Sequence, residues 1–380
     1  MENIWNFTDA SFGQECIKEL KFCLTKIDAR RIFFIHGNSY EKLRGREQID
    51  SILMDYEVYH HVDFAVNPEY NDILKGVKLI YNFKPDAILA VGGGSSIDTG
   101  KLLSVLPNNS ELISETIRSG KVNAIRKIPF FVAPTTAGSG SEATHFAVVY
   151  IGDNKYSVAS PLLLPNHCFV DSVLTWSMSP KLTAITGLDA LSQAVESFWS
   201  VYATEESKRY AAESIRLNLN SFEKSVKSPD AMSREEMTTA SFLAGKAINI
   251  TKTTAVHAYS YYLTKRFGLP HGQSVGILLP YFIKYNMDGK VTNGYCVDIH
   301  RQRMQELCRL FSAESPDGVI RKVNGILACC GLNIPINTLL NNTKDIEEFI
   351  NRVNVERLAN NPVIVQNDLL KSLMEIDVFG

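Results

Sequence analysis

Short apolar runs alternate with amphipathic segments along the first half of the chain. Three largely apolar runs end at or next to glycine or proline and are predicted to be buried strands: residues 31–37, 86–91 and 128–133. Residues 39–54 and 69–82 have helical periodicity, and residues 56–64 have strand character. Strands that alternate with helices over residues 15–180 predict a parallel sheet with right-handed crossovers.

Strand character fades after residue 180, where a proline follows three polar or flexible residues. The later periodic segments predict helices, among them residues 182–201, 205–227 and 233–250. We therefore predict an α/β domain over residues 1–179, followed by an all-helical domain over residues 180–380. Within the second domain, residues 245–267 indicate helix around a threonine-rich turn, and Phe267–Pro270 breaks it before a new helix at His271.

A triple glycine directly follows the strand predicted at residues 86–91. Gly92–Ser95 also opens a helix, so free backbone N–H groups would face an anion there. The spacing differs from G-x-G-x-x-G and from the Walker loop, and the simplest alternative is a tight turn between strand and helix. A second Gly/Thr/Ser turn, residues 135–141, follows the strand at 128–133. Two such turns on one sheet edge favour a dinucleotide ligand.

Two histidines and one acidic residue in the helical half are candidate metal ligands. His257 and His271 lie on either side of the Gly/Pro break and could converge on one ion. Asp189 and Gln193 are four residues apart among apolar neighbours, so both would project from one buried helix face. The alternatives are two ordinary helical histidines and an aspartate satisfied by a helix terminus or a lysine.

Composition narrows the classes of protein that the chain can belong to. The 380 residues are 45% hydrophobic and 21% charged with a net charge of −2, which gives no field to gather nucleic acid or an anionic membrane. The seven cysteines include no Cys-x-x-Cys pair, as expected of reduced thiols in a cytosol. No basic segment leads into an apolar run, so we predict a cytoplasmic protein with neither nucleic-acid nor membrane partners.

Five motifs together resemble the iron-containing (group III) alcohol dehydrogenase family. They occur in the family's order and spacing: Val91–Asp98 with Lys101, Pro134–Glu142, Gly187–Leu191, His257-Ala258 and Pro270–Gly272. The resemblance runs nearly end to end and reaches Leu358–Pro362. It implies the dehydroquinate synthase-like architecture, in which a Rossmann-like dinucleotide-binding domain precedes a helical domain. Nicotinamide and metal would face each other across the cleft.

The resemblance also implies site residues, carried over by position. NADH or NADPH would be bound by residues of the first domain, namely Gly37, Asn38, Gly93, Gly94, Ser95, Asp98, Thr135, Thr136, Ser139, Phe146 and Lys155. One divalent ion, Fe²⁺ or Zn²⁺, would be held by Asp189, Gln193, His257 and His271. Gln193 replaces the family's usual histidine with a weaker and harder donor. Tyr261 replaces a histidine found near the substrate in many members, and it joins His257 and His271 as a predicted catalytic residue.

One branch looks most similar, the phosphonoacetaldehyde reductases (hydroxyethylphosphonate dehydrogenases), on residues 189–200 and 247–255. Lys252, Thr253 and Thr254 would bring a cation and two hydroxyls near the reacting centre, as a phosphonate requires. Alternatively, Lys252 is a solvated surface residue and the threonines cap a helix.

We therefore expect a homodimeric enzyme that uses NAD(P)H to reduce phosphonoacetaldehyde to 2-hydroxyethylphosphonate. Within the family, the alternative is a primary-alcohol or diol dehydrogenase. From other classes, the alternatives are a lyase, as in the related dehydroquinate synthases, and a non-catalytic nucleotide-binding module.

The first predicted strand generates a test of cofactor choice. A carboxylate at its end would bind the ribose 2′-hydroxyl and repel a 2′-phosphate, but none occurs between Ile35 and Glu41. NADPH should therefore support turnover about as well as NADH in steady-state assays. A preference for NADH above about a hundredfold, or about 2.7 kcal/mol, would mean that another feature discriminates between the two cofactors.

Overall fold

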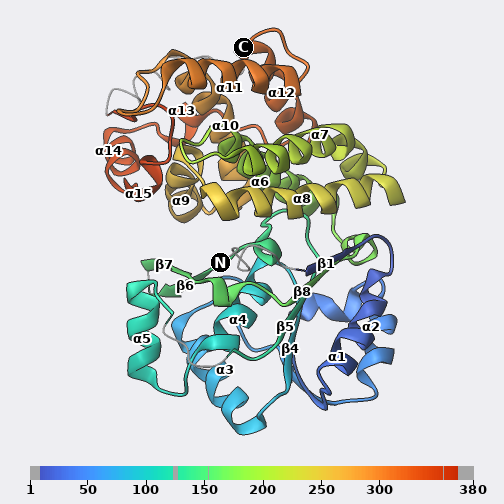
Figure 1. Ribbon diagram of the computed structural model, residues 1–380. Coiled ribbons are helices and arrows are strands. Elements are labelled where there is room, and N and C mark those ends of the chain that lie inside the picture. Colours follow the sequence, from blue (N-terminus) through green and yellow to red (C-terminus); the bar gives the residue numbers. More distant parts are fainter. Residues whose placement is uncertain (1–8, 123–126, 153, 354, 367–380) are drawn as a thin grey trace. The chain divides into compact units, whose positions relative to one another are not determined.

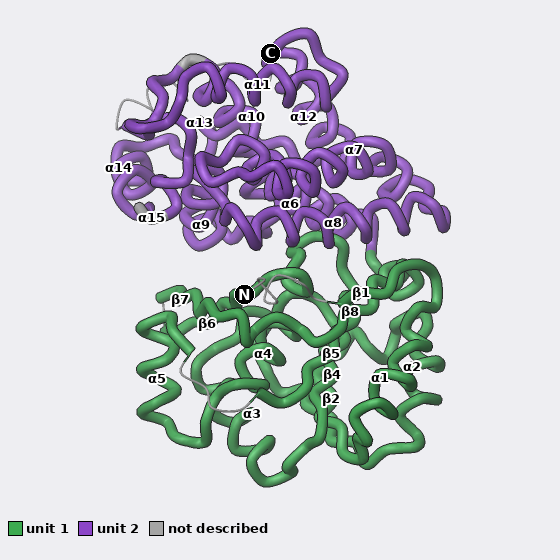
Figure 2. Tube along the Cα trace, viewed as in Figure 1, with its two compact units in different colours: residues 1–178 green, residues 179–380 purple. Residues whose placement is uncertain are grey.

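The computed structural model describes residues 9–122, 127–152, 154–353 and 355–366 (Figure 1). The chain forms two compact units, Met1–Met178 and Ser179–Gly380, which Figure 2 shows in different colours. None of the helices described is long and apolar enough to cross a membrane.

The first unit is built on a parallel six-stranded sheet, as predicted. The sheet order is β1-β8-β5-β4-β2-β3, and every neighbouring pair is parallel. The strands are β1 (Asp9–Phe12), β2 (Arg31–His36), β3 (Glu57–His61), β4 (Ala87–Gly92), β5 (Phe130–Pro134) and β8 (His167–Val170). The sequence pattern did not predict the separate antiparallel hairpin of β6 (Phe146–Ile151) and β7 (Asn154–Ala159).

Helices cover both faces of this sheet (Figure 1). On one face, α1 (Leu20–Lys26) and α2 (Arg46–Leu53) pack with a short 3-10 helix, η2 (Cys16–Glu19). The other face is covered by α3 (Tyr70–Phe83) and α4 (Gly94–Val105), and α5 (Ser110–Ser119) lies beside β7. The predicted helix over residues 39–54 is shorter than expected, because residues Asn38–Lys42 form a separate 3-10 helix, η3.

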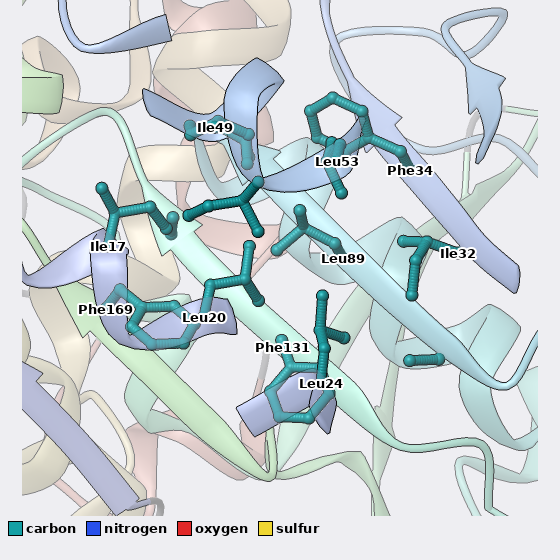
Figure 3. Close-up of a cluster of buried hydrophobic side chains, with 14 of the residues drawn as sticks. Ile17, Leu20, Leu24, Ile32, Phe34, Ile49, Leu53, Leu89, Phe131 and Phe169 are labelled. Atoms are coloured by element: carbon teal, nitrogen blue, oxygen red, sulfur yellow. The ribbon is translucent and has the colours of Figure 1, made fainter. Parts of the chain in front are cut away.

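Alternate residues of each strand face opposite layers of this core. Ile32 and Phe34 of β2 belong to the cluster under α1 and α2, together with Leu89 of β4 (Figure 3). Phe33 points the other way and stacks on Tyr59 at 5.3 Å. Burying each such side chain stabilises the fold by about 1.5–3 kcal/mol. A shift of one residue would expose these side chains, so their burial fixes the strand register and the level at which the strands end.

The second unit is helical throughout its described residues. Its helices are α6 (Pro180–Trp199), α7 (Glu205–Lys227), α8 (Ala231–Thr251), α9 (Ala255–Phe267), α10 (His271–Asp288), α11 (Val297–Leu310), α12 (Pro316–Cys329), α13 (Ile336–Leu339), α14 (Thr343–Asn351) and α15 (Val355–Leu358). Side-chain caps start the three long helices: Ser179 caps α6, and capping boxes begin α7 at Thr204 and α8 at Asp230.

The predicted break between α9 and α10 is present, and so is the threonine-rich turn between α8 and α9. Gly268 ends α9 in the left-handed conformation with φ 66°, and His271 is the first residue of α10. Lys252 ends α8 with φ 59° and ψ −176°. Glycine occupies that backbone region almost alone, and a side chain held there costs about 1–3 kcal/mol.

A glycine allows α10 to approach α6 closely. A Cβ atom on Gly272 would lie 1.9 Å from the carbonyl oxygen of Ile185. No side-chain rotation relieves such a clash, because the opposing atom belongs to the backbone.

Gly272→Ala should therefore destabilise the protein by about 1–3 kcal/mol or more, as overpacking does elsewhere. The control is Gly325→Ala in α12, where an added Cβ meets nothing within 4 Å. That change should stabilise the helix by about 0.5–1 kcal/mol. Urea unfolding of both variants measures the difference, and a Gly272→Ala protein as stable as the parent would refute the close approach.

Candidate active site

Three side chains from three helices of the second unit converge on one point. They are Asp189 of α6, His257 of α9 and His271 of α10, and one ligand atom of each lies within 4.8 Å of the others. Oδ1 of Asp189 is 3.3 Å from Nε2 of His257 and 3.8 Å from Nε2 of His271. The two imidazole rings are 5.3 Å apart at an angle of 67°, so they approach the common point from different directions.

Burial and charge make this cluster a suitable donor set for a divalent ion. Asp189 and His257 are buried, with 8% and 3% of their surface exposed, and His271 is half-buried. Burial alone would raise the pKa of Asp189, but hydrogen bonds and the nearby imidazoles hold it below its ordinary value. A carboxylate with two imidazole nitrogens is a ligand set that both Fe²⁺ and Zn²⁺ accept.

Gln193 lies one turn after Asp189 on the same face of α6. It is buried and forms a side-chain hydrogen bond with Asp189. Its amide oxygen Oε1 is also buried and accepts no hydrogen bond from the residues described. The residue therefore offers an oxygen beside the three convergent ligands, although a weaker one than the imidazole expected there.

Tyr261 stacks on the ring of His271, with 5.6 Å between centroids and 4° between planes. The guanidinium of Arg357 lies 5.3 Å from the centroid of the Tyr261 ring. The sequence analysis predicted a site role for Tyr261 but none for Arg357. Nothing in the local pattern of α15 connects Arg357 to a histidine 86 residues earlier.

Glu196 is a second buried carboxylate of α6, and the sequence analysis gave it no role. Oε1 accepts from the backbone N–H groups of Thr254 at 2.9 Å and His257 at 3.2 Å, and Oε2 bonds Nδ1 of His257. Burial opposes protonation of His257, but the charge of Glu196 and the bond to Asp189 raise its pKa to about 10. The signal was available, because Glu196 lies seven residues after Asp189 and therefore on the same helix face.

The threonine-rich turn differs from its predicted role. Thr254 is fully buried, and its hydroxyl donates to Oε1 of Glu196 at 2.7 Å and accepts from Nε1 of Trp199 at 3.0 Å. The hydroxyl of Thr254 therefore joins the turn to α6, a contact that the sequence analysis did not predict. Thr253 is 4% exposed, and its hydroxyl accepts from Nη1 of Arg357. Lys252, in contrast, is exposed, and its ammonium has no hydrogen bond or ion pair with other described residues.

In the first unit, the two glycine-containing turns lie side by side at the carboxyl ends of β4 and β5. Thr135 N donates to Gly92 O at 3.0 Å. A Cβ on Gly93 would lie 3.3 Å from Oγ1 of Thr136, and one on Gly94 3.0 Å from Oγ of Ser139. Because these two glycines have no side chain, the second turn can pack directly against the first. Helix α4 begins at Gly94, so its first N–H groups lie at this edge of the sheet.

The other predicted cofactor residues occupy the same unit. Gly37 and Asn38 follow β2, and Phe146 and Lys155 belong to the β6–β7 hairpin. Both carboxylate oxygens of Asp98 are hydrogen-bonded inside the protein, to Oγ of Ser141 and to Val148 N. Asp98 thus fixes the second turn and the hairpin.

Two profiles of one protein family cover most of the chain. The profile described as "Iron-containing alcohol dehydrogenase" matches residues 8–172, and "Fe-containing alcohol dehydrogenase family, C-terminal" matches residues 183–375. With the parallel sheet and the convergent cluster, these matches define an NAD(P)-dependent alcohol dehydrogenase or aldehyde reductase. The chain belongs to the iron-containing alcohol dehydrogenase family, as the sequence motifs indicated, and both profiles favour a dehydrogenase over the lyase alternative.

Proteins similar to this chain are named for several activities. The chain is 34% identical to long-chain-alcohol dehydrogenase 1 of Geobacillus thermodenitrificans, over 68% of this chain and 67% of that one. It is 31% identical to the aldehyde-alcohol dehydrogenase of Streptococcus pneumoniae, over 72% of this chain but only 33% of that longer protein. The crystal structure of sulfoacetaldehyde reductase from Bifidobacterium kashiwanohense in complex with NAD⁺ matches with a TM-score of 0.87 and 28% identity, covering 97% of this chain and 96% of that one.

The amide side chain of Gln193 allows the proposed metal site to be tested. Gln193→His should tighten binding of Zn²⁺ or Fe²⁺ by about tenfold or more, or about 1.4 kcal/mol, because imidazole is the better donor. His271→Ala should weaken binding by orders of magnitude, and a chelator should abolish activity. Competition titrations against a chromophoric chelator give the affinities. An unchanged affinity in Gln193→His would show that residue 193 does not reach the ion.

Proposed function

We propose that this enzyme reduces a short aldehyde with an anionic tail to the primary alcohol, most specifically phosphonoacetaldehyde to 2-hydroxyethylphosphonate. The observation that carries the proposal is Lys252. Its exposed ammonium belongs to the turn that leads directly into α9, five residues before the candidate ligand His257. A cation at that point suits an anion attached close to the reacting carbonyl.

The backbone of Lys252 supports a functional reason for this residue. With φ 59° and ψ −176°, glycine would be the less strained choice, yet the turn carries a lysine. Strained residues of this kind concentrate at ligand-binding sites, because the fold holds them in place for a purpose other than stability.

A second cation lies near the same turn. Nη1 of Arg357 donates to the hydroxyl of Thr253, and the guanidinium lies over the ring of Tyr261, which stacks on His271. Guanidinium groups match the oxygens of phosphonates and sulfonates in geometry and charge. Arg357 beside the histidine cluster and Lys252 in the turn before α9 therefore support an anionic substrate over a neutral one.

The named activity of one structural relative agrees with this charge pattern. Sulfoacetaldehyde and phosphonoacetaldehyde share a two-carbon aldehyde and differ in the tetrahedral anion that it carries. The relative named for sulfoacetaldehyde is 28% identical over 97% of this chain. A neutral primary alcohol is the competing substrate class. It is favoured by the NADPH-dependent butanol dehydrogenase of Clostridium saccharobutylicum, which is 34% identical over 73% of this chain.

The proposed roles divide between the two units. An ion bound by Asp189, His257 and His271 would polarise the carbonyl oxygen as a Lewis acid, and the nicotinamide would supply the hydride. Gly93, Gly94 and the first N–H groups of α4 would bind the pyrophosphate. The Asp189 carboxylate would offset the charge of the ion, while Lys252 would hold the anionic tail.

Lys252→Ala should lower kcat/KM for phosphonoacetaldehyde by about two orders of magnitude, because a charge-assisted contact contributes roughly 1.5–3 kcal/mol. Butyraldehyde should be reduced almost as well as by the parent enzyme. Lys252→Arg, which keeps the charge, should retain most of the activity. Lys84→Ala is a matched control, since Lys84 is also exposed at a helix end with φ 53°. Equal losses on both aldehydes would refute the anion-binding role.

A further inference from the structure

Asp189, Gln193 and Glu196 lie on one face of α6, within the part of the helix that is buried. Asp189, Gln193 and Glu196 are spaced four and three residues apart, and they are 8%, 4% and 0% exposed. The first two lie at the candidate metal site. Glu196 lies one turn further along, and burying its charge would be costly without several compensating hydrogen bonds.

Those hydrogen bonds all come from the start of α9. The N-cap residue of that helix, Thr254, makes no capping bond with its own side chain. Oε1 of Glu196 provides the cap from another helix, since it accepts from the backbone N–H groups of Thr254 at 2.9 Å and His257 at 3.2 Å. The Thr254 hydroxyl adds a third bond at 2.7 Å. The neighbouring Ser197 extends the attachment, because its Oγ lies 2.9 Å from Oγ1 of Thr251.

The other oxygen of Glu196 makes a different contact. Oε2 bonds Nδ1 of His257, whose opposite nitrogen Nε2 faces Asp189 at 3.3 Å. A carboxylate at Nδ1 fixes both the rotation of the ring and the position of its proton, and leaves Nε2 as the nitrogen available to an ion. Capping α9 requires only one oxygen of Glu196, so the second oxygen is not explained by helix stability.

We propose that Glu196 is a positioning residue that sets the metal affinity of His257. Through its bonds to Thr254 it also holds the turn that contains Lys252 in place. One carboxylate thereby fixes the ligand imidazole through Oε2 and the turn that carries the substrate-binding cation through Oε1. The part that concerns the anionic substrate rests on the proposed function, whereas the part that concerns the metal does not.

Glu196→Gln tests the metal part with little change in shape. An amide oxygen can still accept from the Thr254 and His257 backbones, but an amide nitrogen cannot accept the Nδ1 proton of His257. Co²⁺ titration of the metal-free protein, followed by visible absorption, should show affinity reduced by about 10–100-fold. Circular dichroism should remain that of the parent protein.

The control is Asp345→Asn, which also changes a buried carboxylate of the helical unit to an amide. Asp345 is 3% exposed and pairs with Arg266 at 2.8 Å. The Asp345→Asn substitution should lower the stability of the protein and leave its Co²⁺ affinity unchanged. The proposal would be overturned if folded Glu196→Gln bound Co²⁺ with an affinity within threefold of the parent protein. It would also be overturned if Asp345→Asn lost as much Co²⁺ affinity as Glu196→Gln.

Two further measurements decide the matter if Glu196→Gln does not fold. Glu196→Asp keeps the charge, but the shorter side chain cannot reach both the start of α9 and Nδ1 of His257. The Co²⁺ affinity of this variant should therefore fall at least fivefold. In the Zn²⁺-loaded parent protein, proton NMR should show an exchange-protected ring N–H at Nδ1 of His257. Absence of that signal alone would overturn the proposal.

The substrate part has its own readout. Glu196→Gln saturated with Zn²⁺ should show a KM for phosphonoacetaldehyde raised about tenfold, against a much smaller change for butyraldehyde. If Lys252→Ala proves unselective between these aldehydes, the proposed function fails while the Co²⁺ result still tests Glu196. If Lys252→Ala is selective and Glu196→Gln is not, only the link between Glu196 and the turn fails.

Discussion

The helical unit depends on the pairing of two buried carboxylates with the imidazoles opposite them. Asp189 and Glu196 are charges removed from water, and they are tolerated because α9 brings partners to both and α10 brings His271 to Asp189. This requirement explains several local features together: the break after Phe267, the close approach at Gly272 and the turn after Thr251. Each allows a helix to begin where its first residues face α6.

The first unit meets a different constraint, which is the close approach of its two glycine-containing turns. The turns after β4 and β5 lie together because their strands are neighbours in register, with Gly92 opposite Pro134. Gly93 and Gly94 have no side chain where Thr136 and Ser139 lie against them, and Asp98 of α4 bonds the second turn at Ser141. The first unit therefore presents N–H groups at this sheet edge, whereas the second presents charged side chains and the candidate metal ligands.

Features specified by neighbouring residues were predictable from the sequence. The parallel sheet, α7 and the start of α10 at His271 follow from periodicity and from glycine and proline signals. The family motifs also indicated the residues that converge at the cluster. The role of Thr254 was not predictable in this way, because its hydroxyl is bonded to a carboxylate 58 residues earlier. Arg357 contacts Thr253 across 104 residues, and no local pattern encodes such a pairing.

The backbone of Lys252 has a consequence for engineering and for comparison with relatives. Selection for thermal stability alone would favour glycine at this position, since glycine relieves the strain. Under the proposed function, the same exchange would also remove the cation that binds the anionic tail of the substrate. Backbone strain and the proposed substrate specificity therefore meet at one residue, so a substitution there is expected to change stability and selectivity in opposite directions.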